Sequence, residues 1–417
     1  MNAEPRPSAR RAAEHAARES YGRLVAHLAR RWGDVAAAED AVSDALRAAL
    51  ETWPQRGIPA SPEAWLLTAS RRSLVDAGRH ADVVRRARGD METLGSPPEL
   101  PDVDLGKVAD DRLRLMLVCA HPAIDESVRP ALILQTVLGL EAERIAGAFL
   151  VSAEAMTKRL VRAKQKIRVA GLRFEEPEPS DLRERLHAVL EAIYAAYALA
   201  DEGGLNEGEA RDELAGEAIY LGRVVAELSQ DPEALGLLSL LQFLEARRPA
   251  QGDPAGEFVP LLEQDPTLWD RARLEEAYAL LGGAASHKVS GPFQLEAAIQ
   301  AAHCHRARTG VVPWPEIYRL YAALVAQYPT VGSQVAFAVA AAQAEGPPHG
   351  FRILEQLATD RVKSYQPWWV ASAHLHEMAG DPVQAARCLE RAIGLTTKPR
   401  MQRFLKRKLH KLRGEPA

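Results

Sequence analysis

Six cationic side chains lie within eighteen residues of the sequence, between positions 151 and 168, against a single acid, Glu154. The six are Lys158, Arg159, Arg162, Lys164, Lys166 and Arg168. Guanidinium and ammonium groups at this density suit a phosphate backbone, and the arginine fork also matches the O6 and N7 atoms of guanine. The segment therefore indicates nucleic-acid binding.

The cationic segment has the periodicity of an α-helix. Its apolar stripe consists of Met156, Leu160, Ala163 and Ile167. Ser152 stands where an N-cap belongs, and a shorter amphipathic stretch over residues 142–149 precedes it. The pattern predicts a helix-turn-helix whose second helix enters the major groove of DNA. The alternative is a solvated amphipathic helix whose cations contact nothing.

We expect the two halves of this second helix to have different roles. Base contacts are predicted for Thr157, Lys158, Arg159 and Arg162, because the N-terminal half of such a helix faces the bases. Phosphate contacts are predicted for Lys164, Lys166 and Arg168.

Other chemistry is not expected from this chain. His303, Cys304 and His305 are adjacent on a predicted helix, so their side chains should diverge and a shared metal is unfavourable. The pairs Cys119 with His121 and His374 with His376 have the same difficulty. Phosphate-loop, nucleophile-elbow and metalloprotease motifs are absent from the sequence. We expect no metal site, no cofactor and no catalysis.

Length and composition predict an all-α protein of two or three domains. The chain has 417 residues, 47% hydrophobic and 26% charged, and Ala and Leu predominate over strand-forming alternation. The net charge of −4 hides an asymmetry: residues 1–172 are cationic on balance and residues 173–417 anionic. Nucleic-acid affinity should therefore belong to a local patch.

The compartment expected from the sequence is the cytoplasm, without a membrane. Three scattered cysteines give no disulfide framework, the N-terminus lacks the apolar core of a signal peptide, and no apolar run is long enough for a membrane span.

Helical segments are expected in three blocks. The first domain covers residues 15–87, and a Pro-, Gly- and acid-rich linker covers 88–108. A second domain, 109–172, contains the helix-turn-helix, and helices fill 181–417. In this tail Ala338, Gly350, Leu354 and Leu357 recur at an offset of 35 as Ala373, Ala385, Leu389 and Ala392. That spacing resembles the tetratricopeptide helix pair.

Three stretches in this order resemble a bacterial RNA polymerase sigma factor of the extracytoplasmic-function class. AEDAVSDALRAALETWP (38–54) resembles the segment of sigma region 2 that docks on polymerase. WLLTASRRSLVDAGRH (65–80) resembles the segment that contacts the −10 element and starts melting. GLEAERIAGAFLVSAEAMTKRLVRAKQKIR (139–168) resembles region 4, which reads the −35 element. CAHPAIDESVRPALILQTVLGL (119–140) and the helical tail point to the subgroup with a long tetratricopeptide-like extension.

The resemblance implies core RNA polymerase and promoter DNA as partners, and a protein or peptide partner for the tail. It places polymerase binding on Glu39, Asp40 and Asp44, on an acidic outer face. It places −10 contact and melting on Arg71, Arg72, Arg79 and His80, which are otherwise ordinary surface charges. The chain departs from the family where Glu141 and Arg144 replace the usual capping box.

The linker supports the same interpretation. A flexible coil of about 20 residues spans roughly 25 Å, and two sites two helical turns apart at ~34–36 Å per turn need it almost fully extended. Polymerase would hold the two domains apart, so the chain alone should bind promoters poorly. The alternatives are a stand-alone helix-turn-helix regulator with a sensor or dimerisation tail, and a helical-repeat scaffold.

Overall fold

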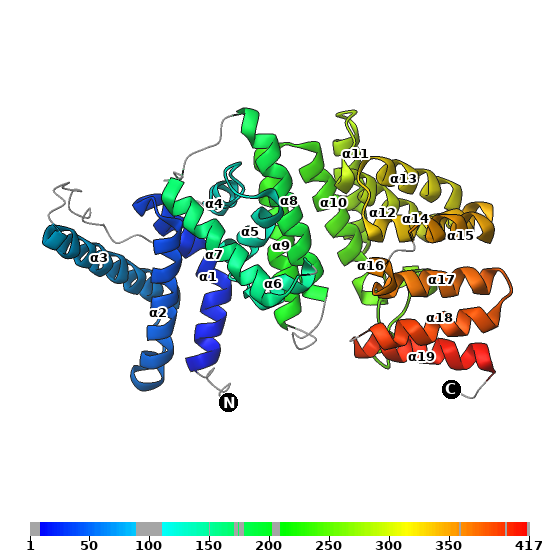
Figure 1. Ribbon diagram of the computed structural model, residues 1–417, viewed down its shortest axis with the longest axis horizontal. Helices are drawn as coiled ribbons and strands as arrows, with labels where there is room; N and C mark the ends of the chain where they lie inside the picture. The colour runs from blue at the N-terminus through cyan, green and yellow to red at the C-terminus, as the bar shows by residue number, and fades with distance from the viewer. Residues whose placement is uncertain are drawn as a thin grey trace. The chain divides into compact units, whose positions relative to one another are not determined.

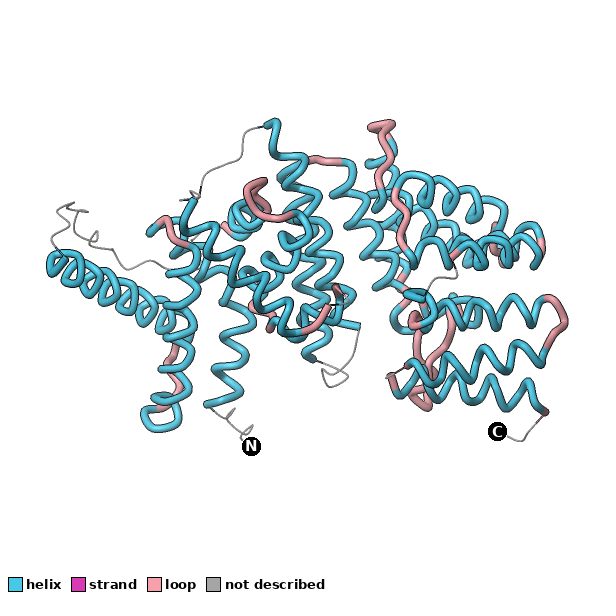
Figure 2. The backbone as a smooth tube through the Cα atoms, in the orientation of Figure 1, coloured by secondary structure: helices cyan, strands magenta, loops and turns pink. Residues whose placement is uncertain are grey.

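The computed structural model describes residues 9–88, 111–149, 151–170, 174, 179–201, 209–357, 360–396 and 398–414. In these ranges the regular elements are helices, with one isolated β-bridge between Gly252 and Phe258 (Figures 1 and 2). The predicted all-α fold is confirmed. Apart from Arg88, the expected linker lies outside the described residues.

The chain forms two compact units. The first comprises Met1–Glu202 with Gly208–Ala218, and the second Gly203–Glu207 with Ile219–Ala417. The first unit holds α1 (Ala9–Trp32), α2 (Val35–Arg56), α3 (Pro62–Arg88), α4 (Arg112–Cys119), α5 (Arg129–Leu138), α6 (Ala142–Ala148), α7 (Ala153–Ala170) and α8 (Pro179–Asp201). Helix α9 (Glu209–Ser229) starts in the first unit and ends in the second, so the division falls after the expected domain start at residue 181.

Helices α1, α2 and α3 pack on one another through their apolar faces. Asp34 caps α2 by accepting a hydrogen bond from the Ala37 amide at 3.0 Å, and Pro62 opens α3. Trp53 of α2 meets Trp65 of α3 edge to face, with ring centroids 5.6 Å apart. Their shared core includes Leu24, Val25, Leu28, Val42, Ala45, Ala49, Leu66 and Leu74.

Helix α5 is buried along most of its length, and α1, α4, α6, α7 and α8 surround it. It ends at Gly139, whose φ of 65° lies in the left-handed region that favours glycine. Around it, Leu115, Leu132, Ile145, Met156 and Leu160 are buried. This core positions α6 and α7, which carry the predicted DNA-binding residues.

The second unit is built on α10 (Pro232–Ala246), which packs against α11 (Arg271–Ala285) and α12 (Pro292–Thr309). A Cβ on Gly236 would lie 2.8 Å from the Gln294 amide, so α10 and α12 approach closely. Four further helices follow in the chain: α13 (Trp314–Gln327), α14 (Val331–Glu345), α15 (Pro347–Gln356) and α16 (Asp360–Lys363). The last three are α17 (Gln366–Met378), α18 (Pro382–Leu395) and α19 (Pro399–Arg413).

The residues of the 35-residue offset lie in equivalent helix pairs. Ala338 and Leu354 are buried between α14 and α15, and Ala373 and Leu389 between α17 and α18. Gly350 faces the Ala338 carbonyl so closely that a Cβ would come within 2.6 Å of its oxygen. Small residues thus let each pair pack tightly, while the tetratricopeptide assignment stays a prediction.

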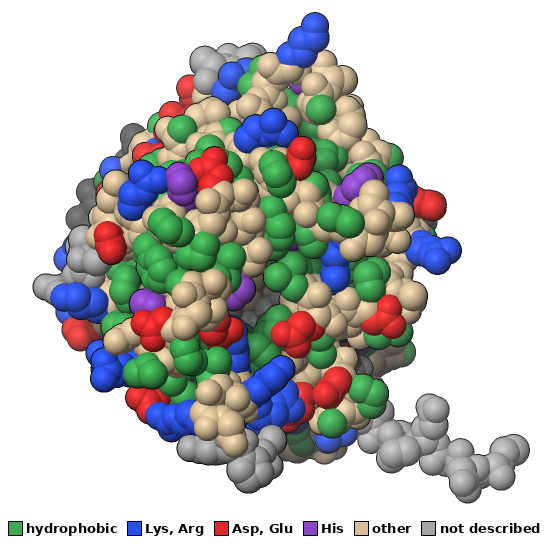
Figure 3. All heavy atoms as spheres, turned by 90° about the vertical axis from the view of Figure 1, so that its right-hand side faces the viewer, with side chains coloured by type: hydrophobic (Ala, Val, Ile, Leu, Met, Phe, Trp, Pro, Cys, Tyr) green, Lys and Arg blue, Asp and Glu red, His purple; other side chains and the backbone are tan. Residues whose placement is uncertain are grey.

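The cationic last helix, α19, is engaged within the second unit. Arg403 and Arg407 both pair with Glu257, at 2.7 and 3.4 Å, and Lys408 pairs with Glu377 at 3.0 Å. Figure 3 shows charges of both signs scattered among apolar side chains over the face it displays. None of the described helices has the length and apolarity needed to cross a membrane.

Candidate nucleic-acid interface

Helices α6 and α7 are joined by a short connection, as the sequence predicts. The Val151 amide donates to the Ala146 carbonyl at 3.1 Å, and the Ser152 hydroxyl accepts from the Ala155 amide at 3.2 Å. The predicted stripe of Met156, Leu160, Ala163 and Ile167 is buried, so it fixes the roll of α7 about its own axis. Glu141 makes no side-chain cap for α6, in keeping with the missing capping box.

Burial of this stripe sends most of the predicted DNA-binding side chains outward. Thr157, Lys158, Arg159, Arg162, Lys166 and Arg168 are exposed. Lys158 pairs with Glu154 one turn earlier at 2.5 Å, a solvent-exposed contact that binding could replace at little cost. Lys164 differs, because it is half-buried and turned toward α2.

Lys164 pairs with Glu39 of α2, at 2.9 Å from its Oε2 and 3.0 Å from its Oε1. Glu39 is only 4% exposed, so the expectation that it lies on an acidic outer face was wrong. Position 39 follows Val35 by four residues and precedes Val42 by three, which places it on the apolar stripe of α2. Burial raises the pKa of the Glu39 carboxyl, and the Lys164 ammonium opposes that shift.

The other two predicted polymerase-binding residues, Asp40 and Asp44, are exposed. Asp44 pairs with Arg47 at 2.8 Å and accepts a hydrogen bond from the Ser73 hydroxyl of α3 at 3.1 Å. The outer face of α2 is therefore acidic at these two positions, and Asp44 also contacts α3.

The second group of predicted DNA-binding residues lies on α3. Arg72 is exposed, whereas Arg71 is half-buried and reaches His27 of α1, with 3.3 Å between Nη2 and Nε2. Burial and then the Arg71 charge lower the pKa of His27. Arg79 and His80 belong to α3, but their side chains lie outside the described residues. His27 was not among the predicted residues, although its position on the inner side of α1 could have indicated a contact with α3.

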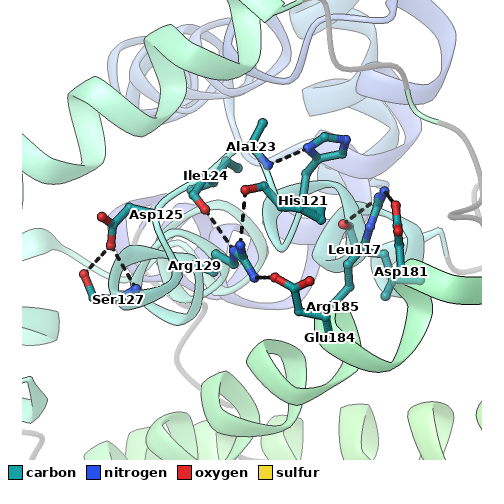
Figure 4. A network of polar contacts seen from close by, with 11 residues as sticks. Leu117, His121, Ala123, Ile124, Asp125, Ser127, Arg129, Asp181, Glu184 and Arg185 are labelled. Carbon is teal, nitrogen blue, oxygen red and sulfur yellow. Dashed lines mark hydrogen bonds and ion pairs between the residues drawn. The ribbon is translucent and has the colours of Figure 1, made fainter.

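Helix α8 is fastened to α4 and α5 by two buried arginines (Figure 4). Arg129 of α5 donates to the carbonyls of Ile124 and Pro122 at 3.0 and 3.3 Å and to Glu184 of α8 at 2.7 Å. Arg185 of α8 donates to the Leu117 carbonyl of α4 at 3.5 Å. The first helix of the expected tail is thus part of the same packed body as α7.

Arg144, one of the two departures from the family pattern, has a structural role. It lies on α6 and donates to the Leu199 carbonyl in the last turn of α8 at 3.3 Å. A cation also suits the negative end of the helix dipole, which favours this contact. Arg144 therefore joins α6 to α8, a role that its position in the sequence did not indicate.

Two protein families match parts of the chain. Residues 18–83 match the family described as sigma-70 region 2, and residues 185–285 match a family of unknown function, DUF6596. The first match falls on α1 to α3 and includes Glu39, Asp44 and Arg72. The second begins in α8 and runs to the end of α11.

The whole chain also has a full-length relative. Over 397 residues it is 36% identical to an uncharacterized protein of Rhizobium meliloti (strain 1021), and the alignment covers 91% of each chain. No solved structure matches the chain.

Proposed function

From the match of residues 18–83 to sigma-70 region 2, which supports a sigma-70-family factor, we propose that this chain directs core RNA polymerase to promoters as a sigma factor of the extracytoplasmic-function class. Region 2 of this family supports binding to RNA polymerase. The finer roles, which are promoter reading, melting and regulation by the tail, belong to the proposal.

The observation that carries the proposal is the exposed cationic face of α7 in a chain that also has sigma-70 region 2. The face presents Arg159 and Arg162 beside one another on the helix surface, three residues apart. Arginine forks reach guanine O6 and N7 in the major groove, and Lys166 and Arg168 suit phosphates further along. Helix α7 would then act as the recognition helix of a helix-turn-helix at the −35 element.

On region 2, Asp40 and Asp44 would meet basic groups of the polymerase, and Arg71 and Arg72 would hold the strand that melts at the −10 element. Unstacking a base costs a few kcal/mol, and backbone contacts offset that cost. The chain supplies binding groups, and the polymerase performs the chemistry of transcription. Such a factor acts in the cytoplasm.

We assign regulation to the second unit. Stacked helix pairs such as α14 with α15 and α17 with α18 offer a surface for a protein or peptide partner. A partner bound there would change how readily the first unit engages polymerase.

Transcription on genomic DNA tests the proposal. Purified full-length chain and core polymerase of the source bacterium are incubated with sheared genomic DNA, and the 5′ ends of the transcripts are sequenced. We expect a small set of shared start sites that core polymerase alone does not produce. Arg159→Ala with Arg162→Ala should lower output at those sites, since each lost base contact costs about 1–3 kcal/mol.

Arg319→Ala is the control, because Arg319 is an exposed cation of α13, in the second unit, and pairs with its helix neighbour Glu316 at 3.1 Å. It should leave start sites and output unchanged. Start sites that appear equally with core polymerase alone would contradict a sigma factor, and specific binding without polymerase would favour a stand-alone regulator.

A further inference from the structure

A short segment outside the helix-turn-helix lies against α7. It is a single turn of 3-10 helix, Glu126–Val128, which connects α4 to α5 and packs on α7. Val128 faces the interior and is 6% exposed, whereas Asp125 and Glu126 are exposed. The segment thus has an apolar anchor and brings two acids close to a cationic helix.

Hydrogen bonds hold the backbone of this segment in place (Figure 4). The Ile124 amide donates to the His121 carbonyl at 2.8 Å, and the Ala123 amide donates to His121 Nδ1 at 3.0 Å. Arg129, at the start of α5, donates from Nε to the Ile124 carbonyl at 3.0 Å. A network in which these groups are satisfied is rigid, so the position of Asp125 beside α7 is well defined.

The carboxylate of Asp125 is also fixed, and one of its oxygens is left over. Oδ1 accepts from the Ser127 hydroxyl at 2.5 Å and from the Ser127 amide at 3.0 Å. Oδ2 accepts no hydrogen bond from any described residue. The two bonds from Ser127, followed by the charges of Arg159 and Arg129, keep the pKa of the Asp125 carboxyl below its ordinary value. Asp125 is therefore a fixed negative charge at neutral pH.

Of the two arginines near Asp125, only Arg159 of α7 has its donors available. Arg129 is buried and bonded to two backbone carbonyls and to Glu184. Arg159 is exposed, and its guanidinium donates to no described residue. A guanidinium has five donors, and two of them suffice for O6 and N7 of a guanine. The others can bind a carboxylate at the same time.

We propose that Asp125 positions Arg159 for base reading: its free oxygen accepts from the guanidinium while the other edge of the fork binds guanine. The inference rests on the proposed function, in which α7 lies in the major groove. An unrestrained arginine can turn to a phosphate, which looks the same beside any base. A carboxylate that holds the side chain opposes that alternative and preserves the bidentate geometry that distinguishes guanine.

The negative charge of Asp125 makes positioning distinguishable from general electrostatics. An acid close to DNA repels phosphates, so its removal should by itself raise the affinity for DNA of any sequence. Loss of a positioning contact should instead lower the preference for one base pair. The two effects have opposite signs and different sequence dependence.

Asp125→Asn tests the proposal, with Glu126→Gln as the matched control. Both substitutions remove one negative charge from an exposed acid of the same segment, and the new amide oxygen at position 125 can still accept from Ser127. Full-length protein with core polymerase is bound to a promoter taken from the start-site mapping, and to variants of it with each base pair of the −35 element replaced in turn. The base pair at which Arg159→Ala abolishes the preference is the one that Arg159 reads.

We expect Asp125→Asn to reduce the preference at that base pair about tenfold, and Glu126→Gln to keep the wild-type preference. In the Arg159→Ala background, Asp125→Asn should have no further effect, because the two residues act through one contact. Undiminished preference in Asp125→Asn would overturn the inference. An equal loss in Glu126→Gln, or a loss that is the same with and without Arg159, would overturn it as well.

A thermal melt checks that each variant is folded. If Asp125→Asn is not, Asp125→Ser decides by the same measurements, since serine also caps a helical turn and carries no charge. A wild-type chain that selects no promoter would instead overturn the proposed function, and the inference with it.

Discussion

His303 is a buried imidazole of the second unit. It lies on α12, 8% exposed, with its ring edge-on to Trp314 at 5.6 Å between centroids. Burial, followed by the charges of Arg247 and Arg306, lowers the pKa of His303 to about 4. Cys304 is buried beside it and His305 is exposed, so the three adjacent side chains diverge as expected from a helix.

Acid should destabilise the second unit through His303. The folded state binds its proton less readily than the unfolded chain, whose imidazole titrates near 6.5, so stability is full above that pH and falls as the pH drops toward 4. Between pH 7.5 and 5 the loss from this residue is about 2 kcal/mol. Urea unfolding of wild type and His303→Gln at both pH values measures it as the difference in acid sensitivity.

The exposed neighbour supplies the control for that comparison. His305→Gln should retain the full acid sensitivity of the wild type, since the exposed ring loses little solvent on folding. Equal acid sensitivity in wild type and His303→Gln would contradict the assignment of the loss to His303.

Single residues also mark where sequence reasoning reaches its limit. The stripe of α7 and the outward cations follow from helical periodicity, which a sequence displays directly. Glu39 was assigned to the surface because acids rarely lie inside, although its spacing from Val35 and Val42 indicated the opposite. Its partner, Lys164, is 125 residues away, and no local rule predicts such a pair.

Among the helices, α8 links the predicted domains. It follows α7 in the chain, yet it packs on α4, α5 and α6, and Arg129 and Arg185 satisfy carbonyls where α4 ends and α5 begins. The existence and limits of most helices were predictable from caps, prolines and apolar spacing. Which helices pack together was not predictable, because α8, which was assigned to the tail, packs on α4, α5 and α6 of the preceding domain through residues that also fit an exposed helix.

Arg129 should be the more important partner of the α5–α8 ion pair. Arg129→Met removes hydrogen bonds to two backbone carbonyls as well as to Glu184, and we expect a loss of about 3 kcal/mol in unfolding free energy. Glu184→Gln retains a polar group at a half-exposed site and should cost under about 1 kcal/mol. Thermal melts of the two variants beside wild type measure the difference; equal losses would show that the ion pair itself dominates.

For the whole molecule, charge distribution matters more than net charge. The sequence is anionic overall, while α7 concentrates cations, and four cations of α19 pair with acids of the second unit. That pairing reduces the positive charge which the last helix offers to DNA. Helix α19 is therefore a weaker candidate for DNA contact than α7, although both are rich in cations.

The free chain should bind promoter DNA weakly. With region 2 packed on α5 and α7, we expect an affinity in the non-specific range, a dissociation constant of about 10 μM at physiological salt. Fluorescence anisotropy with a promoter fragment, with and without core polymerase, measures the gain, which we expect to exceed about a hundredfold. Equal affinity in both conditions would remove the need for a polymerase scaffold.

The packing of α1 on α5 is so close that a Cβ on Gly22 would come within 2.1 Å of the Val137 carbonyl oxygen, and this has a consequence for each newly made molecule. Gly22 and Val137 are separated by 115 positions in the chain. A ribosome that adds about 5–20 residues per second needs roughly 6 to 23 s to make the second after the first. Region 2 is complete by residue 88 and leaves the ribosome without its partner surface. Every newly made copy therefore briefly has region 2 without the α5 surface on which it packs, and the synthesis rate sets how long that interval lasts.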